Sequence, residues 1–197
     1  TVLVINASIN SEQGNSFKAT QLYLDALQAD NKELRIVSLD LEKENLPHLS
    51  AAEMQAWSMP YEEKSDEQKR ISAFSDKYIE LMQQADEIVF GVPMYNFGIP
   101  SVLKAFFDRV ARAGITFTYT ANGPEGLLKN KQAKIIAARG GKYQGTALDT
   151  QSDYLRNLLN FLGVSDTEFF YVEGLAMGED AAKEAWEKFN EKINELN

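Results

Sequence analysis

Five short apolar segments, each followed by a stretch with helical spacing, constrain the fold of this 197-residue chain more than any other feature. The segments cover residues 2–8, 34–40, 86–93, 131–138 and 168–174. Nearly continuous apolar runs of this length are typical of strands buried on both faces of a parallel sheet. The stretches between them repeat apolar residues every three or four positions, as amphipathic helices do. The alternation predicts an α/β fold with one doubly wound, five-stranded parallel sheet and helices on both faces.

The expected strand order is 2-1-3-4-5, which is one of two common orders and the one that suits five strands. The length and the absence of repeats predict a single domain over residues 1–197. Two connections exceed the usual length of about two to six residues. Residues 42–65 are expected to hold a short helix at 51–57. Residues 113–131 are expected to form a long insertion at the active site, with a strand at 115–119 and a turn at "NGPEG".

The composition excludes several kinds of function. The net charge of −9 argues against a nucleic-acid partner, which would require a basic surface. The chain has no cysteine, so disulfides, thiolate catalysis and cysteine zinc sites are excluded, and no metal site is expected. The only histidine, His48, is expected on a surface loop. No signal peptide or membrane-spanning run is visible, so the expectation is a cytoplasmic protein without membrane contact.

The expected strand order also predicts where a ligand binds. The chain changes direction between the first and third strands of the sheet, and ligands of such folds bind outside the carboxyl ends of the strands at that point. The loops after the first, third and fourth strands cover residues 8–16, 93–98 and 138–145. We therefore expect these three loops to meet in one crevice.

The first loop, "ASINSEQGNS", leads directly into a helix and carries Ser8, Gly14, Asn15 and Ser16. Free backbone N–H groups at a helix N-terminus, with hydroxyl and amide side chains beside them, bind anions without a lysine. A phosphate monoester suits such a site, whereas the GxGxxG and GxxxxGK[ST] elements for dinucleotides and nucleoside triphosphates are absent. The alternative is that Asn15 and Ser16 only cap the helix.

The second loop, "GVPMYNFGIP", places Met94, Tyr95, Asn96 and Phe97 between two prolines. Aromatic and thioether groups can form an apolar wall for a flat ligand, while the Asn96 amide can meet the polar edge of a heteroaromatic ring. The alternative is a tight turn whose rings belong to the core.

The third loop, "ARGGKYQG", contains Ala138, Arg139, Gly140 and Gly141. A Gly-Gly pair directly after a buried strand can bring backbone amides against a ligand. Arg139 is expected either to pair with a carboxylate or to form hydrogen bonds within the loop, and a flexible turn is an equal alternative. Together, the three loops predict a ligand with a phosphate at one end and a planar heterocycle at the other, as in flavin mononucleotide (FMN).

The segment "PMYNFGIPSVLKAFFDRVARAGITFTYTANGPEGLL", together with "ARGG", "FLGV" and "EGLAMG", resembles the bacterial FMN-dependent NADH-azoreductases, also described as NADH:quinone oxidoreductases. The resemblance implies a flavodoxin-like fold and a homodimer with one FMN per subunit and active sites at the interface. It also implies FMN contacts from the residues of the three loops named above. The family often has Ser where this chain has Ala138, and Ser where it has Gly14; FMN binding is expected to persist, and the sequence leaves open whether the two changes weaken it.

The activity implied by the resemblance is a two-electron, ping-pong reaction. NADH would pass hydride to flavin N5, and a quinone or azo compound would then be reduced without a catalytic side chain. Phe117, Tyr119 and Phe161 are candidates for the wall of the acceptor pocket. An electron carrier of the flavodoxin kind and an NAD(P)H:FMN reductase that releases reduced flavin remain alternatives.

The helix at 101–112 provides a separate argument for a dimer. Its apolar stripe is wider than one face of a sheet requires, so part of it is expected to contact a partner subunit, and core packing alone is the alternative. The stripe consists of Val102, Leu103, Phe106, Phe107 and Val110.

Overall fold

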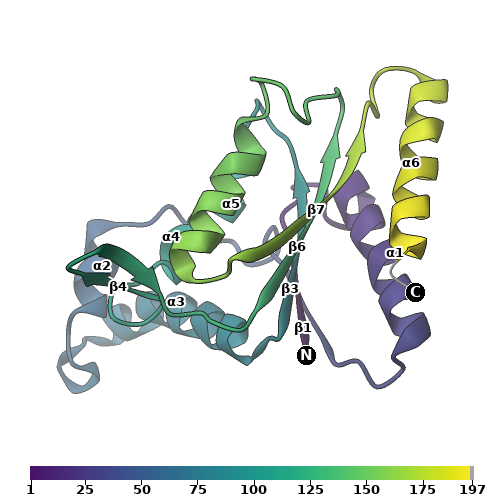
Figure 1. Ribbon diagram of the computed structural model, residues 1–197. Helices are drawn as coiled ribbons and strands as arrows, with labels where there is room; N and C mark the ends of the chain where they lie inside the picture. Colours follow the sequence, from purple (N-terminus) through teal and green to yellow (C-terminus); the bar gives the residue numbers. More distant parts are fainter. Residues whose placement is uncertain (196–197) are drawn as a thin grey trace.

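A five-stranded parallel sheet lies at the centre of the computed structural model, which describes residues 1–195 (Figure 1). The sheet has the strand order β2-β1-β3-β6-β7. Because β4 and β5 form a separate hairpin, this is the predicted order 2-1-3-4-5 of the sheet strands. The strand bounds, β1 (Val2–Asn6), β2 (Ile36–Asp40), β3 (Glu87–Pro93), β6 (Gln132–Arg139) and β7 (Asp166–Glu173), lie within two residues of those predicted.

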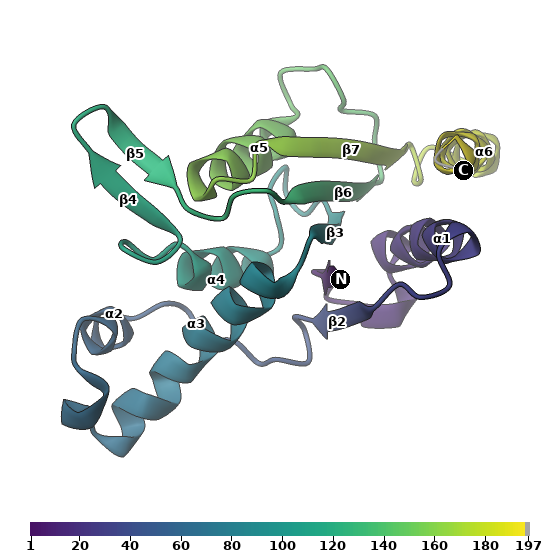
Figure 2. The same ribbon diagram turned by 60° about the horizontal axis from the view of Figure 1, so that its bottom comes forward.

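Helices cover both faces of the sheet, as predicted. Helices α1 (Asn15–Asp30) and α6 (Glu179–Asn194) lie on one face, and α3 (Asp66–Gln84), α4 (Ser101–Val110) and α5 (Thr150–Leu162) lie on the other (Figure 2). Side chains alternate between the two cores along β1: Val2 and Val4 pack with α1 and α6, while Leu3 and Ile5 pack with the other three helices. Leu196, which the sequence places on the apolar stripe of the last helix, lies outside the described residues.

Local sequence signals set several helix ends. Ser65 caps α3 and forms a reciprocal capping box with Gln68. Gly163 ends α5 with a φ of 102°, a left-handed conformation that glycine adopts without strain. The long connection after β2 holds α2 (Ala51–Trp57) at the predicted residues, followed by a 3-10 turn, η2 (Tyr61–Glu63). His48 is exposed in this connection, as predicted.

The apolar stripe of α4 does not provide the expected surface for a partner. Leu103, Phe106, Phe107 and Val110 are all buried in the core of this chain, and only Val102 is partly exposed. The stripe is wide because α4 is covered twice, by the sheet on one side and by α3 and α2 on the other (Figure 2). Core packing, the alternative, therefore accounts for the four buried residues of the stripe and leaves only Val102 for a partner, so this helix gives little support to a dimer.

The long insertion after α4 forms an antiparallel hairpin of β4 (Phe117–Thr120) and β5 (Gly123–Gly126). The predicted strand began two residues too early, and residues 123–126, predicted as a turn, form its second strand. Thr116 explains the first difference, because its N–H and hydroxyl bond to Arg112 and Val110 and continue the turn after α4. The missing N–H of Pro124 is tolerated because this strand is an edge strand.

Two further properties concern the whole described chain. Within residues 1–195, no helix combines the length and hydropathy needed to cross a membrane. In the same residues, no group of three or more His, Asp or Glu side chains is close enough together to hold a metal ion.

Candidate functional site

The carboxyl ends of β1, β3 and β6 lie side by side and bring three loops together. In the sheet register Asn6 pairs with Gly91, and Pro93 pairs with Ala138. A crevice of about 230 Å³ lies above these strand ends. It is lined by Ser8, Asn10, Gly14, Asn15 and Ser16 of the first loop, Pro93, Met94 and Tyr95 of the second, Ala138, Arg139 and Gly140 of the third, and Leu175 and Ala176. The prediction that the three loops form one crevice is confirmed.

The first loop contains an exposed start of a helix. After a 3-10 turn, η1 (Ser11–Gln13), α1 begins at Asn15 with Gly14 as its N-cap and without a side-chain capping bond. Asn15 and Ser16 are thus first-turn residues, and the alternative that they cap the helix is wrong. The buried Ser16 hydroxyl has no hydrogen-bond partner within the described residues. Uncapped N–H groups at a helix N-terminus beside such a hydroxyl are suited to an anion.

Gly14 is required at this point because of a close approach rather than because of its backbone angles. Its φ of −72° suits any residue, but a Cβ atom would lie 2.2 Å from Ser8 Oγ. Ser8 Oγ in turn accepts a hydrogen bond of 3.1 Å from Asn10 N. A serine could not occupy position 14 without displacing Ser8, so the geometry gives no support to a loss of affinity from a missing hydroxyl at Gly14.

The second loop is a tight turn with its rings outside the core. Tyr95 and Gly98 exchange two backbone hydrogen bonds of 3.1 and 3.0 Å, and Asn96 and Phe97 between them have φ values of 50° and 66°. These angles correspond to a type I′ turn. Phe97 is 48% exposed, and the Tyr95 hydroxyl accepts a hydrogen bond from Ile9 N. The alternative that places both rings in the core is therefore wrong.

An open hollow of about 660 Å³ adjoins the crevice and shares Met94 and Tyr95 with it. Asn96 lines this hollow, whereas Phe97 and Gly141 line neither space. The other lining residues of the hollow are Ile9, Ile99, Pro100 and Ser101. The site thus has a narrow, polar part at the start of α1 and a wide, more apolar part over the second loop.

Arg139 in the third loop is buried, and its side chain is bound entirely by the protein. Its guanidinium pairs with Asp149 at 3.0 Å and with Glu173 at 2.9 Å. The prediction that Arg139 pairs with a carboxylate is confirmed, and its side chain has no exposed surface to offer a ligand. Burial acts to raise the pKa of Asp149, but hydrogen bonds from Arg139 and Ser152 outweigh burial and hold that pKa below its ordinary value.

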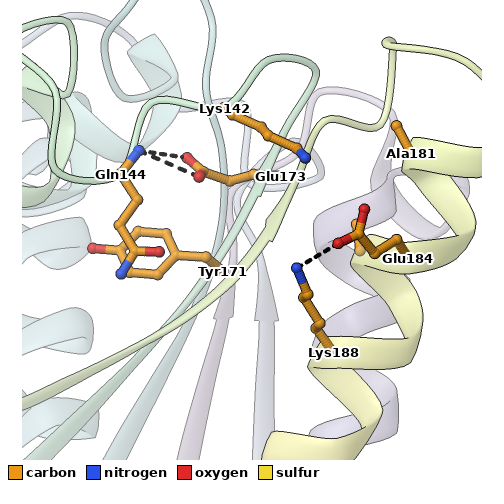
Figure 3. Close-up of a pocket in the computed structure, with 8 residues that line it drawn as sticks. Lys142, Gln144, Tyr171, Glu173, Ala181, Glu184 and Lys188 are labelled. Carbon is orange, nitrogen blue, oxygen red and sulfur yellow. Dashed lines mark hydrogen bonds and ion pairs between the residues drawn. The ribbon is translucent and has the colours of Figure 1, made fainter.

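Glu173 also fixes the rest of the third loop. Its carboxylate accepts a hydrogen bond from Tyr143 N at 3.0 Å. It also accepts one from Gln144 N at 3.0 Å (Figure 3). These bonds favour an ordered third loop over the alternative of a flexible turn. A hollow of about 190 Å³ lies between this loop and α6. Glu184 and Lys188 of α6 line it and pair with each other (Figure 3).

The sequence did not predict the contribution of the loop after β7. Leu175 and Ala176 line the crevice, and their N–H groups donate to Arg139 O and Gly140 O at 3.2 and 2.9 Å. A Cβ atom on Gly140 would lie 3.3 Å from the Ala176 methyl group, which is a tight contact. Glycine at position 140 therefore lets the loop after β7 lie close to the third loop. The signal was present, because "EGLAMG" directly follows the last buried strand and so lies at the same edge of the sheet.

Phe117, Tyr119 and Phe161 lie together, but not at this crevice. The Phe117 ring is 4.4 Å from that of Phe161 and 5.4 Å from that of Tyr119, which is 74% exposed. The hairpin packs against the C-terminal end of α5. Just after the hairpin, Leu128 N donates a hydrogen bond to Leu162 O of that helix. The N-terminal end of α5 contacts the second loop through Thr150. Since a 13-residue helix spans about 20 Å, the structure keeps these rings far from the crevice of their own chain (Figure 1).

A family model described as "Flavodoxin-like fold" matches residues 1–196, and the chain belongs to this family. A protein of Alteromonas mediterranea named "FMN-dependent NADH:quinone oxidoreductase" is 52% identical over 196 residues, which are 100% of this chain and 98% of that protein. A protein of Cellvibrio japonicus with the same name is 48% identical over 91% of this chain and 90% of its own length.

Solved structures agree with these relatives. An azoreductase from Bacillus anthracis strain Sterne has a TM-score of 0.89 and 30% identity, covering 99% of this chain and 97% of that chain. An FMN-dependent NADH-azoreductase from the Ames Ancestor strain of the same species, solved in complex with FMN, has a TM-score of 0.86 and 25% identity, covering 99% and 98%.

Proposed function

We propose that this chain is an FMN-dependent oxidoreductase that takes hydride from NADH and reduces quinones and aromatic azo compounds. The names of its relatives support this activity. The observation that carries the proposal is the geometry of the site, where an anion site at the start of α1 adjoins an open, more apolar hollow. A phosphorylated molecule with a flat ring suits both parts at once.

The residues of the crevice fit FMN. Ser8, Gly14, Asn15 and Ser16 would hold its phosphate through hydroxyl and backbone N–H groups, and the unpartnered Ser16 hydroxyl would gain an acceptor there. No lysine lines the crevice, and its one arginine side chain is bound by carboxylates, so recognition would depend on these neutral groups.

The ring would lie against the second and third loops. Met94, Tyr95 and Asn96 would form its wall, with the backbone of Ala138, Arg139 and Gly140 at its edge. N–H groups near Asn96, Gly140 and Gly141 would stabilise negative charge, as donors in an oxyanion hole do. When bound, FMN supplies the redox chemistry, accepting hydride at N5 and passing two electrons to the acceptor.

We further propose that NADH and the acceptor use the same open face of the site in turn. The protein would release NAD⁺ before it binds the quinone or azo compound, which is ping-pong kinetics. Initial rates measured at several fixed acceptor concentrations should give parallel double-reciprocal lines against NADH. Converging lines would contradict the shared face.

The proposed assembly is a homodimer with active sites at the interface. Phe117, Tyr119 and Phe161 can wall an acceptor pocket only if they come from the partner subunit, because α5 separates them from their own crevice. The exposed Tyr119 ring and the open hollow over the second loop support this arrangement.

Absorbance spectroscopy followed by anaerobic stopped-flow mixing with NADH tests the proposed function. The purified protein, or the protein after addition of FMN, should be yellow and should lose its colour on mixing with NADH. An electron carrier would stay yellow until a separate reductase was added, and a reductase that releases flavin would lose the reduced flavin on gel filtration. A colourless protein that does not bind FMN would contradict the proposal.

A further inference from the structure

The side chain of Gln151, on the first turn of α5, joins the second and third loops of the site. It is 1% exposed, and its Nε2 donates to Pro93 O at 2.9 Å and to Gly98 O at 3.0 Å. Its Oε1 accepts from Arg139 Nε at 3.3 Å and from Arg139 Nη2 at 3.1 Å. Both donors and both acceptor positions of the amide are therefore used within the protein.

The part of the second loop that Gln151 holds is strained. Asn96 and Phe97 have positive φ values of 50° and 66°, and a type I′ turn normally places glycine at the second of these positions. A bulky residue in this conformation persists only where its surroundings fix it. Gln151 binds carbonyl groups on both sides of the strained pair, and Thr150 Oγ1 donates to Phe97 O at 2.6 Å between them.

The Oε1 atom of the Gln151 amide contacts the third loop through Arg139. Arg139, which Gln151 binds, directly precedes Gly140 and pairs with Glu173 at 2.9 Å. Glu173 in turn holds the N–H groups of Tyr143 and Gln144. A change at Gln151 would thus reach both loops, one directly and the other through Arg139.

We propose that Gln151 is a positioning residue that sets the spacing of the two loops against which the flavin ring lies. The proposal rests on the proposed function, since it concerns the ring end of that site. Gln151 itself does not line the crevice and acts through the backbone of residues 93–98 and through Arg139.

Amide hydrogen exchange of the protein without FMN tests the coupling by itself. Gln151→Leu should speed exchange about tenfold, the effect of about one lost hydrogen bond, in peptides 93–98 and 140–145. Gln151→Glu keeps an acceptor for Arg139 but loses both donors, so only peptide 93–98 should exchange faster. Thr150→Val should also affect peptide 93–98 alone, and Gln132→Leu, at the exposed start of β6, is the matched control without effect.

A second measurement follows the ring in the FMN-loaded protein. Gln151→Leu and Gln151→Glu should change the visible circular dichroism of bound FMN and slow its bleaching by NADH about 10- to 100-fold, because small displacements of a reacting group cost this much. Residues 11–16 should keep their exchange rates, because no hydrogen bond joins them to either loop that Gln151 holds, whereas Ile9 N bonds to the Tyr95 hydroxyl and is left out of this comparison.

The outcomes separate the two proposals. If both peptides of Gln151→Leu exchange at the wild-type rate, the positioning role is overturned. It is also overturned if exchange becomes faster throughout the protein, including β1 and β3. Unchanged circular dichroism and bleaching in both variants would overturn it as well. A wild-type protein that binds no FMN would instead overturn the proposed function, while the exchange data would still report whether Gln151 couples the loops.

Discussion

Single residues at the start of α1 decide how an anion can be held in this protein. Ser8, Gly14 and Ser16 line the crevice, and in the proposed site backbone N–H groups and hydroxyls, rather than a cation, would face the phosphate. Because the space beside Ser8 is narrow, we expect FMN binding to depend on the size of the side chain at position 14.

Gly14→Ala should weaken FMN binding about 5- to 150-fold, because overpacking of one methyl group costs about 1–3 kcal/mol. The added Cβ would lie 2.2 Å from Ser8 Oγ and would force that hydroxyl or the helix start to move. Titration of the protein without FMN, followed by quenching of flavin fluorescence, measures the affinity. Lys18→Ala, an exposed change on the same helix, is the control, and equal affinities of the two variants would contradict a phosphate site here.

Asp149 links the stability of the protein to acid pH. Its pKa in the folded protein lies below the ordinary value, so the folded form binds this proton less readily than the unfolded chain does. The stabilisation is therefore complete above the ordinary pKa and is lost as the pH falls through the folded pKa. Asp149→Asn removes a carboxylate partner of the buried Arg139 while keeping a residue that can cap α5.

We expect Asp149→Asn to lower the free energy of unfolding by about 1–3 kcal/mol at neutral pH, the range for hydrogen bonds to charged groups. The difference from the wild type should shrink as the pH falls below about 4, where the carboxylate of the unfolded chain takes up a proton, and should vanish below the lower pKa of the folded protein. Urea unfolding between pH 3 and pH 7 measures it. A difference that does not depend on pH would assign the effect to capping alone.

At the scale of the elements, a buried ion pair fixes the short helix α2 against α4. Arg109 donates to both carboxylate oxygens of Glu53 at 2.9 and 2.8 Å, and the two side chains are 0% and 3% exposed. The Arg109 carbonyl also accepts a hydrogen bond from Ser75 of α3. These contacts hold α2 in a connection whose neighbouring residues are largely exposed.

Glu53→Gln should lower the free energy of unfolding by about 3–5 kcal/mol, because it leaves the Arg109 charge buried without a counter-charge. The double change Glu53→Met with Arg109→Met should lose less than this, since no charge then remains buried. Thermal and urea unfolding measure both. Glu184→Gln, which breaks an exposed pair with Lys188, should leave the midpoint unchanged, and an equal loss from it and Glu53→Gln would contradict the role of burial.

At the scale of the whole molecule, the hairpin of β4 and β5 has no role at the crevice of its own chain. In the proposed homodimer the hairpin would contact the site of the partner subunit, and its exposed Tyr119 would have a role there. A C2 dimer brings two such contacts at once, so each active site would contain residues of both subunits.

Mixed dimers test this arrangement. Tyr119→Glu subunits and Gly14→Leu subunits should each give nearly inactive protein, the first through the acceptor pocket and the second through FMN binding. Co-expression should restore about a quarter of the wild-type turnover, because half of the dimers would be hybrids with one intact site. Sedimentation of a monomer, or full turnover by Tyr119→Glu alone, would contradict the shared site.

Much of the fold could be predicted from the sequence because its signals are local. Short apolar runs predicted the five sheet strands, and the 3.6-residue spacing predicted the helices that cover them. The topology then placed the loops after β1, β3 and β6 at one edge of the sheet, which is where the crevice lies. The errors occurred where two patterns overlap, as at Thr116, whose alternating neighbours suggested a strand although its hydrogen bonds continue the turn after α4.

What the sequence by itself determined is therefore the order of the elements, the edge at which the loops meet and the neutral, phosphate-suited character of the first loop. Only the tertiary structure decided that α4 is covered on two sides, that Arg139 is bound by Asp149 and Glu173, and that the hairpin lies one helix length from its own crevice. Periodicity reports that a side chain is buried, but its partner is set by residues that are distant in the chain. Gln151 is such a case, because its role follows from bonds to residues 93, 98 and 139, which local sequence does not reveal.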